Sequence, residues 1–169
     1  MYKDPTTGAS DVKVGNDRSK KIIYIAGPLF SEHERKFLEE IVETLAKELK
    51  LDPKKDIFLP HRDAGDIGTH EGERESTFFS DLKHLDNAKV VVALLDGPDV
   101  DSGTAVELGY AYARRKEVFG LLTDWRRWSQ DGKVLNINNM VWGVCGKGKR
   151  IFKKIDKEFI RSLKEVLNK

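Results

Sequence analysis

The spacing of the apolar positions along the chain changes repeatedly between two patterns. Short apolar runs rich in β-branched residues, typical of buried strands, are separated by stretches with helical spacing. The strand-like runs lie at 21–26, 56–60, 90–95, 117–123 and 150–152, and the helical stretches at 31–49, 75–85, 103–115, 138–144 and 156–167. This alternation predicts one doubly wound α/β domain, flavodoxin-like or Rossmann-like, whose five parallel strands form a sheet with helices on both faces.

The helical stretches carry their own start signals and apolar stripes. Ser31 and Glu34 form an S-x-x-E capping box, and Asp156 is placed to cap the last helix. Helical spacing predicts that the two central helices face the core through Phe78, Phe79, Leu82, Leu85, Ala105, Leu108, Ala111 and Tyr112. Asp81 then stands close to the apolar side of its helix.

Three polar segments are expected to lie outside this regular structure. Residues 1–20 are rich in small and charged side chains and predict a flexible arm that precedes a domain over 21–169. Residues 61–74 have several glycines and no period, which is typical of a ligand lid. Residues 124–132 predict a second loop.

Composition excludes several classes of partner. The net charge is +2, with 30 basic and 28 acidic residues interspersed, so we expect no nucleic-acid partner. The single cysteine, Cys145, excludes an internal disulfide and a cysteine-based zinc site, as expected for a cytoplasmic protein. No apolar run approaches the roughly 18 residues of a membrane span, and the N-terminus lacks a signal-peptide core, so we expect a soluble protein without a membrane partner.

Motifs for common cofactors and nucleophiles are missing from the sequence. Neither G-x-G-x-x-G nor a Walker A motif is present, and the histidines are scattered at spacings that do not match a metal site. Ser76, Ser80 and Ser102 lack the context of a nucleophile elbow. We therefore expect no cofactor and no metal.

Carboxylates dominate the remaining chemistry. The segment 89–116 predicts a buried strand, an acidic loop with Asp96, Asp99 and Asp101, and a helix that carries Glu107. Ligands of open α/β sheets bind beyond the carboxyl ends of the strands, where Asp81 is also expected. One carboxylate as nucleophile and a second as proton donor can cleave a glycosidic bond, and Tyr24 could orient the nucleophile. A solvated acidic loop and a packed strand tyrosine are the alternative interpretation.

Four segments together resemble the nucleoside 2-deoxyribosyltransferase family. They are YIAGPLF at 24–30, SDL around Asp81, LLDGPDVDSGTAVELGYA at 94–111 and NNMVWG at 138–143. The resemblance implies transfer of a 2-deoxyribosyl group between nucleobases by double displacement through a covalent glycosyl-enzyme. The expected partners are then 2-deoxynucleosides and free nucleobases.

The resemblance also implies roles for particular residues. Glu107 corresponds to the nucleophile, Tyr24 to its orienting partner and Asp81 to the residue that exchanges protons with the base. Asp101 corresponds to the residue that holds the sugar 5-hydroxyl, and Phe30 to a residue that lines the base pocket. Further substrate contacts are implied for Gly27, Asp63, Gly103, Asn138 and Met140, the last two reaching into a neighbouring subunit of a homo-oligomer with shared active sites.

Three other functions stay open at this point. A sister group with a similar fold, the deoxynucleoside 5-monophosphate N-glycosidases, uses the same kind of glutamate nucleophile but transfers the sugar to water. His61 or Arg62 could approach the phosphate of such a substrate. A nucleotide-binding module without catalysis is the second alternative, because flavodoxin-like sheets host many binders. A structural protein whose acidic loop aids solubility is the third.

Overall fold

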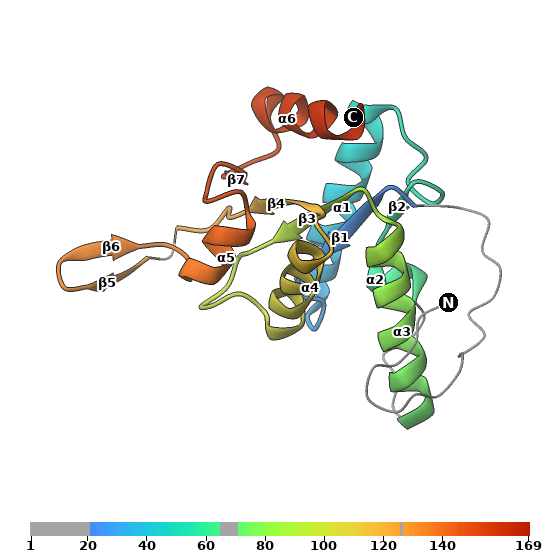
Figure 1. Cartoon of the computed structure of the whole chain (residues 1–169), viewed down its shortest axis with the longest axis horizontal. Coiled ribbons are helices and arrows are strands. Elements are labelled where there is room, and N and C mark those ends of the chain that lie inside the picture. The colour runs from blue at the N-terminus through green and yellow to red at the C-terminus, as the bar shows by residue number, and fades with distance from the viewer. Residues whose placement is uncertain (1–20, 65–70, 126) are drawn as a thin grey trace.

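The computed structural model describes residues 21–64, 71–125 and 127–169, and the expected arm over 1–20 lies outside them. Five strands form one parallel sheet: β1 (Ile23–Ala26), β2 (Ile57–Phe58), β3 (Val90–Leu94), β4 (Glu117–Leu121) and β7 (Ile151–Phe152). Their order is β2-β1-β3-β4-β7, as in flavodoxin-like folds (Figure 1). The predicted fold class is confirmed.

Helices cover both faces of the sheet. One core cluster joins the sheet to α1 (Glu32–Leu49) and α6 (Lys157–Leu167), and the other joins it to α3 (Glu71–Asn87), α4 (Ser102–Ala113) and α5 (Asn139–Val144). Because successive strand residues point to opposite faces, Ile23 and Ile25 belong to the first cluster and Tyr24 to the second. Tyr24 therefore lies on the face of the sheet that α3 and α4 cover.

The expected helix starts at Ser31 and Asp156 are confirmed. Ser31 Oγ accepts from the Glu34 backbone N–H at 3.3 Å, and the Glu34 carboxylate accepts from the Ser31 N–H at 2.8 Å. Asp156 Oδ1 accepts from the first-turn N–H groups of α6, that of Phe159 at 3.1 Å. These caps satisfy backbone donors that have no partner inside the helix.

Helices occupy both ends of the segment 61–74, where one irregular loop was expected. The short helix α2 (Pro60–Asp63) occupies its beginning, and α3 starts at Glu71 instead of 75. Proline suits the first helical turn, and Asp63 accepts a hydrogen bond from the Leu59 N–H at 2.9 Å, which stabilises the start of α2. Residues 65–70 of the expected lid lie outside the described residues.

Two side chains that were expected to face the core are exposed. Leu82, Leu85, Leu108 and Ala111 are buried as predicted, but Phe78 is 54% and Tyr112 61% exposed. Phe78 lies in the first half of α3, and this half projects beyond the other helices (Figure 1). Tyr112 lies in the last turn of α4.

The expected loop over 124–132 contains half of a β-hairpin. β5 (Trp128–Gln130) pairs antiparallel with β6 (Lys133–Leu135), and the hairpin projects from the body of the molecule (Figure 1). Asp131 and Gly132 connect the strands with φ of 51° and 74°. An Asp-Gly pair is the usual sequence of such a two-residue turn, so the sequence contained the signal for this hairpin.

Among the described residues, every helix is too short or too polar to cross a membrane.

Candidate active site

A hydrogen bond between Tyr24 and Glu107 lies at the centre of the candidate site. Tyr24 is fully buried in β1, and its hydroxyl donates to Glu107 Oε1 at 2.6 Å. Glu107 lies in the second turn of α4, which follows β3, the parallel neighbour of β1. The helices that follow β1 and β3, α1 and α4, cover opposite faces of the sheet. The pair therefore lies between two adjacent strands whose connections diverge, which is the usual ligand position in flavodoxin-like sheets.

Burial changes the acid–base properties of this pair. Burial, together with the smaller effects of the Asp81 and Asp101 charges, raises the pKa of Glu107 to about 8, against the lowering effect of the Tyr24 hydrogen bond. The pKa of Tyr24 is well above its usual value, first because of burial and then because of the neighbouring Glu107 and Asp81 charges. Tyr24 therefore keeps its proton at neutral pH and stays a hydrogen-bond donor to Glu107.

Asp81, on α3, is the third member of the cluster. Its Oδ1 atom is buried and has no hydrogen-bond partner among the described residues. Burial raises the pKa of Asp81 to about 7, and its charge in turn raises the pKa of both Tyr24 and Glu107. Since a buried polar atom without a partner is costly, this oxygen is free to bond a ligand. The fold thus brings the three predicted catalytic residues together.

Asp101 lies at the start of α4, one and a half turns before Glu107. Its Oδ2 atom accepts from the backbone N–H of Thr104 at 2.9 Å and from the Thr104 hydroxyl at 3.1 Å. A Cβ atom at Gly103 would approach that same oxygen to 3.2 Å. Thr104 is 1% exposed and holds Asp101 in place, a role that the sequence analysis missed although Asp with Thr three residues later is a capping pattern. These contacts use Oδ2 and leave Oδ1 for a ligand.

The other two aspartates of the acidic loop have structural contacts. Asp96 accepts hydrogen bonds from the backbone N–H and the hydroxyl of Thr123, which ties the end of β3 to the end of β4. Asp99 accepts from the N–H of Val100 at 2.8 Å. Of the three, only Asp101 is near enough to Glu107 to raise its pKa.

Gly27 and Phe30 lie in the loop that follows β1. A Cβ atom at Gly27 would come within 2.7 Å of Leu38 Cδ2 and 3.2 Å of Leu94 Cβ, so glycine allows α1 to pack closely against the sheet. Phe30 is 71% exposed. The loop thus presents an uncovered aromatic ring at the carboxyl edge of the sheet.

Asp63 contacts basic side chains and a backbone N–H of this protein. It forms an ion pair with Lys21 at 2.7 Å, and Arg62 donates to both of its carboxylate oxygens at 2.9 Å. Arg62 also donates to the backbone carbonyls of Pro53 and Ile57, and His61 contacts Glu39 at 3.1 Å. These contacts anchor the β2–α2 junction and engage both side chains that were considered for a phosphate.

Asn138 and Met140 lie at the start of α5. Asn138 Oδ1 accepts from the Met140 N–H at 2.8 Å and so caps the helix, while Met140 is 77% exposed. Trp142, one turn later than Asn138, is 44% exposed. Among the described residues of one chain, no hydrogen bond or ion pair joins Asn138, Met140 or Trp142 to Tyr24, Asp81 or Glu107.

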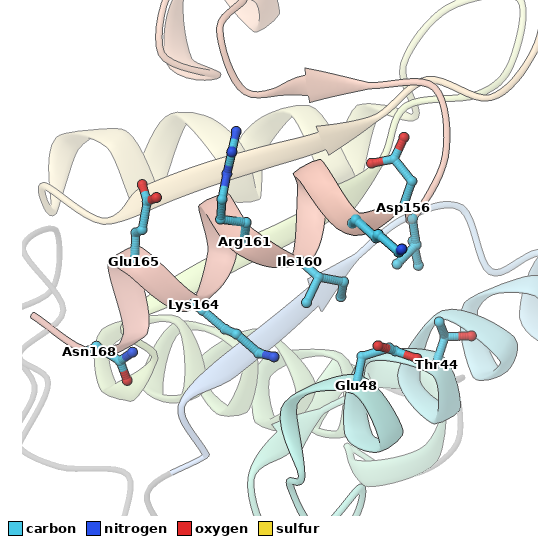
Figure 2. A pocket seen from close by; sticks show the side chains of 10 residues that line it. Thr44, Glu48, Asp156, Ile160, Arg161, Lys164, Glu165 and Asn168 are labelled. Carbon is cyan, nitrogen blue, oxygen red and sulfur yellow. The ribbon is translucent and has the colours of Figure 1, made fainter.

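A hollow of the described surface lies away from this site. It has a volume of about 680 Å³ and lies between α1 and α6, where Ile160 and Lys164 face Thr44 and Glu48 (Figure 2). That is the opposite face of the sheet from Tyr24. Over the described part of the chain, no three histidine, cysteine, aspartate or glutamate side chains are grouped so that they could hold a metal ion.

Fold and site define a flavodoxin-like protein with two half-buried carboxyl groups and a buried tyrosine at the edge of its sheet where such folds bind ligands. The family model for nucleoside 2-deoxyribosyltransferase matches residues 23–140. The chain belongs to the nucleoside 2-deoxyribosyltransferase family. The family acts on nucleosides, so the protein is a glycosyl-transferring or glycosidase enzyme.

Individual proteins are similar to this chain in sequence or structure, and one of the three that follow is named as a 2-desoxiribosyltransferase. An uncharacterized protein of Ureaplasma parvum is 32% identical over 140 residues, which cover 75% of this chain and 87% of the relative. A conserved protein of Enterococcus faecalis has a similar structure, with a TM-score of 0.68, 26% identity and coverage of 86% and 98%. A 2-desoxiribosyltransferase from Leishmania mexicana gives a TM-score of 0.59, 25% identity and coverage of 85% and 97%.

Proposed function

We propose that the protein transfers a 2-deoxyribosyl group from a nucleoside to a free nucleobase by double displacement, with Glu107 as the covalent nucleophile. The observation that carries the proposal is the 2.6 Å hydrogen bond from Tyr24 to Glu107. It fixes one carboxylate oxygen of Glu107 and leaves the other for attack. The nearby Asp81, whose Oδ1 atom is buried, supports the proposal because it supplies the second carboxyl group that the chemistry needs.

The reaction then has two balanced steps. In the first, ionised Glu107 attacks the anomeric carbon of the sugar, the C–N bond breaks, and the departing base takes its electron pair together with the proton of Asp81. In the second, a ring nitrogen of an incoming base attacks the anomeric carbon, its proton passes to Asp81, and the C–O bond to Glu107 breaks. Tyr24 donates its hydrogen bond throughout and keeps the carboxylate aimed.

Product analysis tests this function directly. The full chain is incubated with deoxyinosine and adenine, and the products are separated by chromatography. Formation of deoxyadenosine is expected and identifies a transferase. Release of deoxyribose without a new nucleoside would instead identify a hydrolase, and unchanged substrates with stoichiometric binding would identify a non-catalytic binder.

The charge of Asp101 predicts the substrate class. Its free Oδ1 atom can accept a hydrogen bond from a sugar 5-hydroxyl, whereas an ionised carboxylate repels a 5-phosphate dianion. We expect kcat/KM for deoxyinosine to exceed that for deoxyinosine monophosphate by at least about tenfold. Asp101→Ser should narrow this ratio, and it is a mild change because serine is also a good N-cap for α4. A preference of the unchanged protein for the monophosphate would favour the N-glycosidase alternative.

The exposure of α5 predicts a shared active site. If Asn138 and Met140 complete the pocket of a neighbour, the active form is a homo-oligomer with two-fold symmetric contacts. Exposed Met140 and Trp142 are side chains of the kind that protein interfaces favour. Light scattering at assay concentration should therefore show an oligomer, and dilution into the monomer range should abolish activity. A fully active monomer would reject this arrangement.

A further inference from the structure

Phe78 is an aromatic side chain on the sheet-facing line of α3 that the core does not cover. Phe78, Leu82 and Leu85 are spaced i, i+4 and i+7, so they lie along one side of the helix. Leu82 and Leu85 are 7% and 1% exposed, and Leu85 packs in the same cluster as Tyr24. Phe78 continues this line but is 54% exposed, because the first half of α3 extends beyond the rest of the layer (Figure 1).

The helix that carries Phe78 also carries one of the carboxyl groups of the candidate site. α3 leads into β3 and packs against α4, the helix that holds Glu107, and Asp81 of α3 is close enough to Glu107 to raise its pKa. Asp81 follows Phe78 by three residues, a spacing that makes their side chains neighbours on the helix surface. The ring of Phe79 packs edge-on against that of Phe78, with centroids 5.3 Å apart, and supports its orientation.

We propose that Phe78 is the stacking surface for the nucleobase of the substrate and is thus a positioning residue for base exchange. The inference rests on the proposed function, because a base that exchanges a proton with Asp81 must lie within hydrogen-bond distance of it. A planar base at that position comes within reach of the ring one turn earlier on α3. Since every nucleobase has a π face, this contact strengthens binding without selecting between bases.

The partition of the glycosyl-enzyme between acceptor base and water gives a sensitive test. At a fixed adenine concentration, Phe78→Ala should lower the ratio of deoxyadenosine to free deoxyribose by about tenfold, the effect of losing one base–aromatic stack. Both products come from the same intermediate, so a loss of folded protein cancels in the ratio. Phe78→Tyr should keep the wild-type ratio, and Tyr112→Ala, which removes a similarly exposed aromatic from the last turn of α4, should leave the ratio unchanged.

Equilibrium dialysis of free adenine against the full chain separates this proposal from the proposed function. If the wild type only hydrolyses nucleosides, the transferase proposal fails, yet Phe78→Ala should still weaken adenine binding by about tenfold. An unchanged partition ratio and unchanged adenine binding in Phe78→Ala would overturn the stacking role. So would an equal loss in Tyr112→Ala, or dissociation of an oligomer by Phe78→Ala without any change in base affinity.

Discussion

Glu107→Ala should fold and lose at least about three orders of magnitude in kcat/KM, the range expected when a group that reacts covalently is removed. No second carboxylate is held by Tyr24 as Glu107 is, so the described site offers no substitute nucleophile at that position. Steady-state kinetics with deoxyinosine and adenine measures the loss. Activity close to that of the wild type in this variant would reject Glu107 as the nucleophile.

Mass spectrometry of the intact protein distinguishes a lost nucleophile from a damaged fold. Wild type mixed with deoxyinosine and no acceptor should gain the mass of one deoxyribosyl group, and Glu107→Ala should gain none. Because Glu107→Ala leaves the buried Tyr24 hydroxyl without its acceptor, it should cost about 1–3 kcal/mol of stability. Glu107→Gln keeps an acceptor for Tyr24 and is the matched control: it should retain the wild-type Tm but remain inactive.

Features that depend on neighbouring residues were predictable from the sequence. The Ser31–Glu34 capping box fixes the start of α1 through contacts three residues apart, and the β-branched run at Val90–Leu94 forms a strand that is buried along its whole length. The parallel sheet follows from the alternation of strands and helices, whereas the strand order does not, because flavodoxin-like and Rossmann-like orders share this alternation. The Asp131–Gly132 turn is also signalled by two neighbouring residues, although a loop and not a hairpin was predicted there.

Features that join distant parts of the chain could not be predicted from local patterns alone. Periodicity places Phe78 on the inward line of α3, but whether a sheet lies beneath it depends on the lengths of both elements. The contact between Tyr24 and Glu107 spans 83 residues and could be anticipated only from the topology and the family resemblance. The ion pair between Asp63 and Lys21 could not be foreseen, because the two residues are 42 positions apart in the sequence.

Asp81→Asn should lower kcat/KM for deoxyinosine by about 100-fold, the contribution typical of a general acid or base. Burial raises the pKa of Asp81 to about 7 and that of Glu107 to about 8. The first step needs an ionised Glu107 and a protonated Asp81, so the pair must carry one proton. It carries two protons at low pH and none at high pH, and the wild-type profile of kcat/KM should therefore peak between about pH 7 and 8.

The variant should change the shape of this profile as well as its height. Asparagine cannot lose a proton, so the decline above the maximum should disappear. The rise should move to lower pH, because the Asp81 charge that raises the pKa of Glu107 is gone. A 2-deoxyriboside whose leaving group departs without protonation provides the control, and its kcat/KM should fall by less than about tenfold, since attack by Glu107 remains intact. An equal loss with both substrates and an unchanged alkaline decline would show that Asp81 acts by holding the pocket in shape and not by exchanging a proton.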